Sequence, residues 1–279
     1  MQTLTCGRFR LALDRPHIMA IVNVTPDSFS GDGVGSDLDA ALRRAEAALA
    51  DGADLLDVGG ESSRPGAAPV AEQVELDRIV PLVERLAGCP VPISIDTVKP
   101  AVMRAAIAAG ASLINDINAF QAPGAVEAVR EGDAALCVMH MRGEPRSMQI
   151  DPRYDDVVAE VGAYLDERVS ALRAYGVAAE RLIVDPGFGF GKTLEHNLAL
   201  LGALDRFAAS GLPVLVGMSR KSMLGAITGR PVGERVMASA AAALLAVQRG
   251  ASIVRVHDVA ATRDALAVWQ ALLPYAGRP

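Results

Sequence analysis

Residues 182–185 read Leu-Ile-Val-Asp, a short apolar run of β type that ends on a polar side chain. Apolar runs of this length and type, bounded by turn-forming residues, predict strands. The same form recurs at residues 18–24 around Asn23, 55–58 with Asp57, 91–95 before Asp96, 112–117 around Asn115 and Asp116, 135–139 before His140, 214–218 before Ser219, and 253–256 before His257. With residues 182–185, the sequence therefore predicts eight strands.

Segments of helical period lie between these runs, and most of them end at a glycine. The predicted helices cover residues 37–51, 72–87, 100–109, 124–130, 154–175, 194–209, 233–249 and 260–272. Glycines follow these segments and would serve as left-handed C-caps, a conformation in which a Cβ is sterically unfavourable. They are Gly52, Gly88, Gly110, Gly132, Gly176, Gly211 and Gly250. Strands that alternate with helices predict a parallel sheet built from βα units.

Eight such units without a break in composition predict an α/β fold. They favour a single (β/α)8 TIM barrel over an open doubly wound sheet. Residues 1–13 alternate polar and apolar side chains, which predicts a short β-hairpin. We expect one domain over residues 1–279, in which residues 1–16 close the bottom of the barrel. Because the carboxyl ends of barrel strands converge on one face, side chains from Asn23 to His257 should line a single pocket.

Composition excludes several classes of protein. The 279 residues carry a formal net charge of −6 and show no basic stripe, which disfavours nucleic acid as a partner. Cys6, Cys89 and Cys137 have no paired spacing and are expected to be reduced thiols of an intracellular protein. No apolar stretch approaches the roughly 20 residues of a membrane-spanning helix, so we expect no membrane partner and a cytoplasmic location.

The segment 187–193, Gly-Phe-Gly-Phe-Gly-Lys-Thr, ends like a nucleotide-binding P-loop. Pro186, however, occupies the place of the first glycine of that motif, and two aromatic residues crowd the turn. We interpret the segment as a glycine-rich ligand loop in which Phe188 and Phe190 offer flat apolar surface to a ring-shaped ligand.

Asp96 and Asp185 each end an apolar run, and Asn115 lies near the end of another. Carboxylates that begin a loop can cap the following helix, which is the simpler interpretation for Asp96. Two carboxylates and an amide in one pocket also suit a ligand rich in N–H donors, such as an aminopyrimidinone ring. Both interpretations stay open on the sequence alone.

Arg255 and His257 lie two residues apart in the last predicted strand, so their side chains share a face. An inward cation inside a barrel is costly unless an anion meets it, and phosphates often bind near the last barrel strands. The alternative for Arg255 is a salt bridge to a neighbouring carboxylate. Arg64, in the loop after the second barrel strand, offers a second anion-binding guanidinium.

Further polar residues have less specific interpretations. Lys221 follows the seventh strand and can reach the acceptor atoms of a ligand, whereas Arg220 is expected to form an ion pair or face solvent. His17 and His196 have no partner at zinc-like spacing and are interpreted as structural. A Mg²⁺ ion that bridges phosphate oxygens to the side-chain carbonyl of Asn23 would need few protein ligands.

Five separated blocks of the chain resemble the signature of the bacterial dihydropteroate synthase family. They are residues 23–30 (Asn-Val-Thr-Pro-Asp-Ser-Phe-Ser), 59–66 (Gly-Gly-Glu-Ser-Ser-Arg-Pro-Gly), 185–192 (Asp-Pro-Gly-Phe-Gly-Phe-Gly-Lys), 219–221 (Ser-Arg-Lys) and 255–257 (Arg-Val-His). The order and spacing of the blocks match from residue 18 to residue 257. One departure is Ser63, which stands where the family loop carries a threonine.

The resemblance implies a (β/α)8 homodimer that condenses 6-hydroxymethyl-7,8-dihydropterin diphosphate with p-aminobenzoate, releasing pyrophosphate and 7,8-dihydropteroate for folate synthesis with Mg²⁺. By the same resemblance, the pterin ring is held by Asp96, Asn115, Asp185, Lys221, Met139, Phe190 and Gly217. The diphosphate is held by Asn23, Arg64, Arg255 and His257, with Asn23 also on the metal. The p-aminobenzoate region is lined by Phe29, Ser63, Pro65, Phe190, Lys221 and Ser222.

Catalysis would then consist of assisting the departure of pyrophosphate, with Arg255, His257, Lys221 and Arg64 as the catalytic residues. The two other functions that the sequence leaves open are a pterin-dependent methyltransferase module and a pterin-binding paralogue that does not turn over. The first has no use for a diphosphate pocket, so Arg64 with Arg255 and His257 argues against it. Loss of site residues would be expected of the second.

Overall fold

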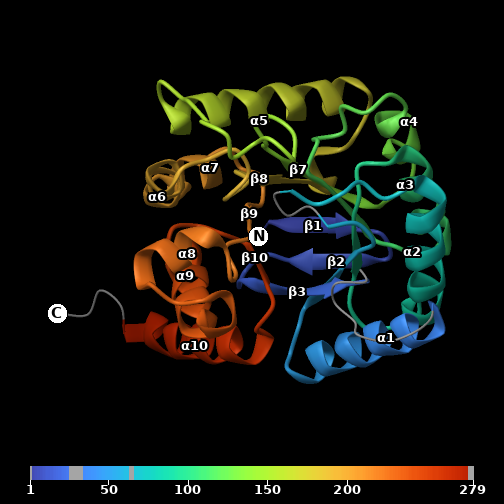
Figure 1. The fold of residues 1–279 in the computed structure, drawn as a ribbon, viewed down its shortest axis with the longest axis horizontal. Coiled ribbons are helices and arrows are strands. Elements are labelled where there is room, and N and C mark those ends of the chain that lie inside the picture. Colours follow the sequence, from blue (N-terminus) through green and yellow to red (C-terminus); the bar gives the residue numbers. More distant parts are fainter. Residues whose placement is uncertain (1, 25–33, 63–65, 276–279) are drawn as a thin grey trace.

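A computed structural model describes residues 2–24, 34–62 and 66–275 (Figure 1). Eight parallel strands form one sheet in the order β8-β7-β6-β5-β4-β3-β10-β9. They are β3 (His17–Asn23), β4 (Leu55–Gly59), β5 (Ile93–Asp96), β6 (Leu113–Asp116), β7 (Ala135–Met139), β8 (Leu182–Asp185), β9 (Leu215–Val216) and β10 (Ile253–Val256). A parallel bridge between Val184 and Val214 brings the two edges together, so the sheet curls into a nearly closed barrel. The predicted (β/α)8 fold is confirmed.

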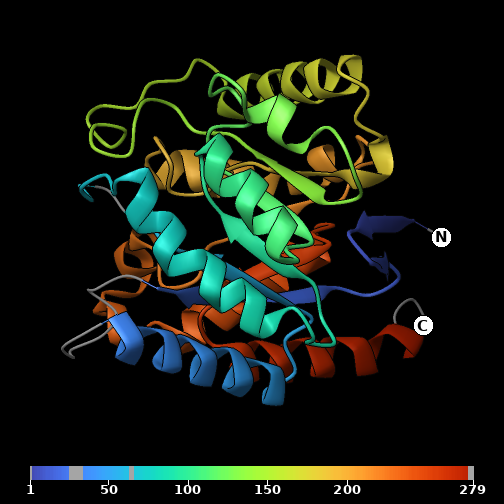
Figure 2. The ribbon, with the colours of Figure 1, turned by 90° about the vertical axis from the view of Figure 1, so that its right-hand side faces the viewer.

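Helices surround the sheet (Figures 1 and 2). They are α1 (Val34–Ala50), α2 (Glu72–Leu86), α3 (Pro100–Ala109), α4 (Ala125–Val129), α5 (Val157–Ala174), α6 (Leu194–Gly202), α7 (Leu204–Ala208), α8 (Ser222–Thr228), α9 (Val236–Gln248) and α10 (Val259–Leu272). Among the residues described, no helix is long and apolar enough to span a membrane.

The helix predictions are correct in outline and wrong at two places. The predicted helix 194–209 is two helices, because the chain leaves helical geometry at Ala203, directly after a glycine that weakens the helix interior. Helix α8 was not predicted, since its seven residues include Gly225 and have no side-chain cap. The predicted bounds 100–109 of α3 match the structure, with Pro100 in the first turn and Gly110 as a left-handed cap at φ 116°.

Six of the seven glycines expected to end helices have positive φ, and Gly88 is the exception. The turn after α2 is closed instead by a hydrogen bond from the Cys89 amide to the Leu86 carbonyl, 2.8 Å long. This turn needs no left-handed residue, so the prediction for Gly88 is wrong.

An N-terminal hairpin, β1 (Thr3–Cys6) with β2 (Phe9–Ala12), packs against one end of the barrel (Figure 2). Its Leu4 belongs to the same buried cluster as Leu55 and Ile253, the first residues of β4 and β10. Side chains alternate along a strand, so residues two positions further on, Asp57 and Arg255, share the inward face. The barrel interior is therefore apolar near the hairpin and polar toward the carboxyl ends of the strands.

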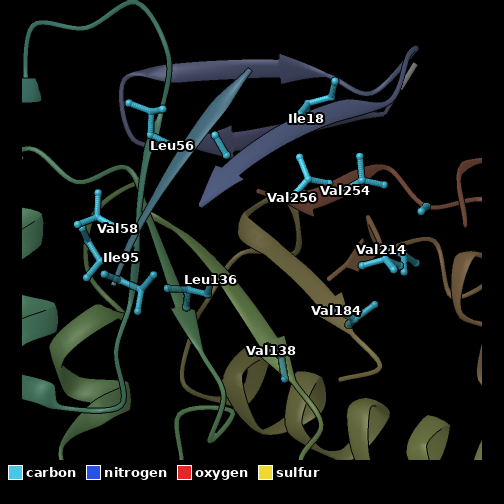
Figure 3. Packing of buried hydrophobic residues seen from close by; sticks show 14 of the residues in the cluster. Ile18, Leu56, Val58, Ile95, Leu136, Val138, Val184, Val214, Val254 and Val256 are labelled. Atoms are coloured by element: carbon cyan, nitrogen blue, oxygen red, sulfur yellow. The ribbon is translucent and has the colours of Figure 1, made fainter. Parts of the chain in front are cut away.

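The opposite faces of the strands form the largest apolar cluster of the described residues (Figure 3). Ile18, Val58, Val138 and Val254 are fully buried there, against side chains such as Ile79 from the surrounding helices. This packing of helices on strands holds the strand ends in fixed register.

Phe188 is a core residue and does not face a ligand, which corrects the expectation for this side chain. It is fully buried and lies in the large cluster between sheet and helices. Phe190, two residues later, belongs to a separate small cluster with Met139, Met148 and Ile117. The glycine turn thus directs its two aromatic rings to different places.

We expect Phe188→Ala to lower the free energy of unfolding by about 3–5 kcal/mol, because it removes a fully buried aromatic side chain and leaves a cavity. Urea denaturation followed by circular dichroism measures the change. Tyr175→Ala, at a half-exposed position, is the control and should change stability little. Equal stability of the Phe188 variant and the wild type would place this ring outside the core.

Candidate active site

The strand ends bring the predicted ring-binding residues to one rim of the barrel. Asp96 at the end of β5 is in register with Asn115 of β6. Met139, the last residue of β7, is in register with Asp185, the last residue of β8. The register of the paired strands thus brings these separated residues to one end of the barrel, as expected.

Arg255 is held between two carboxylates inside the barrel. Its Nε lies 2.5 Å from Asp57 Oδ2, and its Nη2 lies 3.0 Å from Asp96 Oδ2. Ser94 Oγ donates to the other oxygen of the fully buried Asp57 at 2.5 Å. These contacts are the salt bridge that the sequence left open as the alternative for Arg255. Burial lowers the pKa of the guanidinium and the charge of Asp57 raises it, and the net result is a pKa above the usual range of arginine.

The same cluster sets the charge state of Asp96. Burial raises the pKa of Asp96 to about 7, while Arg255 lowers it and Asp57 raises it. Asp96 does not cap the next helix, since α3 begins after Lys99 without a side-chain cap. The capping interpretation is therefore excluded for Asp96, and its carboxyl group remains at the rim.

Asp185 and Lys221 face each other across the loop that follows β8. Asp185 Oδ1 accepts a hydrogen bond of 2.7 Å from the Gly187 amide. Lys221 Nζ donates to the Phe188 carbonyl at 2.5 Å and lies 4.5 Å from the centre of the Phe190 ring. Burial lowers the pKa of Lys221 to about 8, although the Asp185 carboxylate raises it. Burial also raises the pKa of Asp185.

Asn115 presents a buried acceptor to the pocket. Among the described residues, its Oδ1 has no hydrogen-bond partner, although the side chain is only 4% exposed. A buried polar atom without a partner costs about 1–3 kcal/mol. A ligand that donates an N–H to this oxygen would recover that free energy.

The ends of β9 and β10 form the neighbouring part of the rim. Ser219 Oγ lies 3.1 Å from His257 Nδ1 and accepts from the His257 amide at 3.1 Å. Arg220 pairs with Asp258 through two nitrogens, which confirms the ion-pair expectation. Gly217 lies beside Arg255, since a Cβ at Gly217 would be in van der Waals contact with the Cβ of Arg255, at 3.7 Å.

At the end of β3, Asn23 is in register with Gly59, and Gly59 with Asp96. The Asn23 amide lies beside Gly59, since a Cβ on Gly59 would be 3.5 Å from Asn23 Oδ1. Among the described residues, no group of three His, Cys, Asp or Glu side chains lies close enough to hold a metal.

Residues 19–257 match the family described as pterin binding enzyme. The chain belongs to the pterin-binding enzyme family. It is 52% identical to a dihydropteroate synthase of Neisseria meningitidis over 95% of this chain and 96% of the relative.

Solved structures of two members superpose over nearly the whole chain. Burkholderia cenocepacia dihydropteroate synthase complexed with 7,8-dihydropteroate is 58% identical, with a TM-score of 0.91 and coverage of 99% and 98%. Xanthomonas albilineans dihydropteroate synthase with 4-aminobenzoic acid is 50% identical, with a TM-score of 0.92 and full coverage of both chains, 100% and 100%.

Some residues expected at the site of this pterin-binding enzyme lie outside the described residues. They are Phe29, Ser63, Arg64 and Pro65. The described base of the loop after β4 is held from α2, where Arg78 donates to the Gly60 carbonyl at 2.8 Å. Lys99 pairs with both Glu61 of this loop and the buried Glu75 of α2.

Asp57 and Ser94 are the site residues that sequence reasoning missed. Asp57 stood out as a polar strand residue without an assigned role, and Ser94 was not considered. Alternation along the strands was the available signal, since Asp57 follows inward Leu55 by two and Ser94 precedes Asp96 by two. What alternation did not indicate is the partner, a guanidinium from β10.

We predict that Asp57→Asn lowers the pH at which the protein loses its affinity for pterin. Asp57 raises the pKa of Asp96, so removing its charge favours the ionised form of Asp96 and lowers that pKa. If the ring N–H groups need the carboxylate, the loss of affinity on acidification, expected near pH 7 in the wild type, should move to lower pH. Isothermal titration with a dihydropterin across pH 5–9 measures it.

Asp264→Asn, an exposed position on α10, is the matched control and should leave the pH profile unchanged. An unchanged acid limb in the Asp57 variant would show that Asp57 does not act on Asp96.

Proposed function

We propose that this protein catalyses the dihydropteroate synthase reaction, condensing 6-hydroxymethyl-7,8-dihydropterin diphosphate with p-aminobenzoate. The observation that carries the proposal is the match between this chain and known dihydropteroate synthases. The match covers nearly the whole chain at about 50% identity or more, and two of these synthases have structures that hold the product or 4-aminobenzoic acid. The polar groups at the rim described above support this proposal.

The pterin ring would lie against Asp96, Asn115 and Asp185. Its N–H donors would be met by the two carboxylates and by the unpartnered Asn115 oxygen. Lys221 would donate to a ring acceptor, and Met139, Phe190 and Gly217 would form the apolar wall. A ring that satisfies these buried groups is favoured over one that lacks the N–H groups, because each unpaired group is costly.

The diphosphate would lie toward Asn23 and His257, with Arg64 and Arg255 as cations. Arg255 is paired with Asp57 and Asp96. Its contribution to the leaving group would therefore depend on sharing its remaining N–H donors, since a guanidinium has five. As the carbon–oxygen bond breaks, charge grows on the pyrophosphate, and these donors stabilise it.

The donor set at Asn23 fits Mg²⁺ held chiefly by substrate. A single hard oxygen from the Asn23 amide is the kind of ligand that Mg²⁺ takes beside phosphate oxygens and water. When bound there, Mg²⁺ would act as a Lewis acid that withdraws charge from the diphosphate.

The p-aminobenzoate would bind over the Lys221 and Phe190 pair. The ammonium lies against the aromatic face, so a benzoate ring stacked nearby would meet an apolar surface and a positive charge. Ser222 at the start of α8 would contribute a hydroxyl, and Phe29, Ser63 and Pro65 would complete the wall. The aryl amine then attacks the methylene carbon that the pyrophosphate leaves.

The decisive test is pyrophosphate release by the purified protein given both substrates and Mg²⁺. We expect turnover that requires p-aminobenzoate. We also expect Asp185→Ala to weaken pterin binding about 100-fold, because two ring N–H groups would lose their acceptor at about 1–3 kcal/mol each. Arg206→Ala, on an exposed part of α7, should change neither quantity. Pterin binding without pyrophosphate release would instead identify a non-catalytic paralogue.

We also propose a homodimer formed through α9 and α10, which pack side by side (Figure 1). A groove of about 420 Å³ between them is lined by Leu244, Trp269, Leu272 and other side chains. Val268 is 74% exposed and Leu272 60%, so this face presents a contiguous apolar surface. Such surfaces on soluble proteins mark interaction sites.

Leu272→Glu should convert the dimer into a monomer, because it places a charge in an apolar interface. Sedimentation velocity at micromolar concentration measures the change. Leu198→Glu, an exposed leucine on α6, is the control and should keep the wild-type mass. A monomeric wild type, or a dimer that survives in the Leu272 variant, would contradict this interface.

A further inference from the structure

Lys192 is a buried lysine that neither the ring, the diphosphate nor the benzoate accounts for. Its side chain is 3% exposed, and its Nζ donates to the carbonyls of Gly187 at 2.9 Å and Phe190 at 3.0 Å. The same Nζ lies 2.9 Å from Nδ1 of His140 and 3.4 Å from the His140 carbonyl. All four partners are uncharged acceptors, and burial lowers the pKa of Lys192 to about 7.

The contact with His140 specifies the state of that imidazole. When Lys192 is protonated, its ammonium has only donors, so the Nδ1 atom facing it at 2.9 Å then acts as the acceptor. Burial, followed by the charges of Lys192 and Arg142, lowers the pKa of His140 to about 3, which keeps the ring neutral. The His140 amide also donates to the Asp185 carbonyl at 3.0 Å, which joins the end of β7 to the end of β8.

The turn that Lys192 holds carries two side chains of the pterin pocket. The Gly187 carbonyl accepts from Lys192 and from the Phe190 amide, 3.1 Å away, and the Gly187 amide donates to Asp185 Oδ1. One end of the turn thus fixes the Asp185 carboxylate, and the other end fixes the Phe190 ring.

Close packing and hydrogen bonds restrict the backbone conformation of this turn. Gly187 has φ 70°, and a Cβ there would lie 1.9 Å from the His140 carbonyl oxygen. The Gly189 amide donates to Asn197 Oδ1 at 2.7 Å, and Tyr154 donates to the Gly191 carbonyl at 2.9 Å. Two lysines donate to carbonyl groups of this turn: Lys221 to Phe188, and the buried Lys192 to both Gly187 and Phe190.

We propose that Lys192 is a positioning residue, which ties the turn of residues 187–190 to His140 and thereby places Asp185 and Phe190 for the pterin ring. The inference rests on the pterin pocket proposed above. It also accounts for the segment that imitates a P-loop, because the lysine points into the protein and holds carbonyl groups.

The test is Lys192→Met, which keeps the length of the side chain and removes all its donors. We expect the KM for the pterin diphosphate to rise about 10-fold or more, with a smaller change in the KM for p-aminobenzoate. Titration with a dihydropterin should show the same loss. Leu82→Ala, a buried position on α2, is the control: it should lower the melting temperature while leaving the pterin KM unchanged.

Nitrogen-15 NMR of His140 gives a second readout, which reports whether Lys192 contacts His140 in solution. In Lys192→Met the Nδ1 resonance should shift, because its donor is gone, and the pKa of His140 should rise. If Lys192→Met does not fold, His140→Asn and His140→Leu replace it as a pair. Asn keeps an acceptor at the Nδ1 position and should bind pterin, whereas Leu removes it and should bind weakly.

The outcomes separate the two proposals. A wild type that binds no dihydropterin overturns the pterin pocket and this inference with it. A wild type that binds, together with a Lys192 variant of unchanged pterin affinity, overturns the role of Lys192 alone, whatever the His140 resonance does.

Discussion

The pocket depends on one buried guanidinium. Arg255 lies inside the barrel, where an unpaired charge would be costly, and its two carboxylate partners come from different strands. Asp57 lies one layer below Asp96, so the guanidinium spans from the barrel interior to the rim. Its position is therefore determined by strand register, and any shift in register between β4, β5 and β10 would leave a buried charge without its partner.

This arrangement divides the pocket by the kind of polar group. Asp96, Asn115 and Asp185 present oxygen acceptors on the ring side of the described rim, which suits a ligand with N–H donors. The anionic part of a substrate would lie toward the ends of β3 and β10, where Asn23, Arg255 and His257 lie. One bound molecule would have its orientation selected before any bond breaks.

Sequence reasoning recovered the barrel because alternation of strands and helices is a local pattern, and helix bounds such as 100–109 follow from a proline and a glycine. It placed Asp96, Asn115 and Asp185 on one rim because parallel strand ends converge. It failed where the answer depends on contacts between distant segments. The burial of Phe188 and the pairing of Asp57 with Arg255, 198 residues away, are decided by tertiary packing that no local pattern carries.

Lys221 and Lys192 donate to the same turn and show why a motif needs its geometry. Burial lowers the pKa of both, to about 8 for Lys221 and about 7 for Lys192. Lys221 follows β9 and faces Asp185 and the Phe190 ring, so its charge is available to a ligand. Lys192 ends a turn whose glycines adopt positive φ, which points carbonyl groups inward. A P-loop directs amide N–H groups at a phosphate, whereas here the turn directs carbonyls at its own lysine. The sequence Gly-Lys-Thr is compatible with both, and the backbone decides between them.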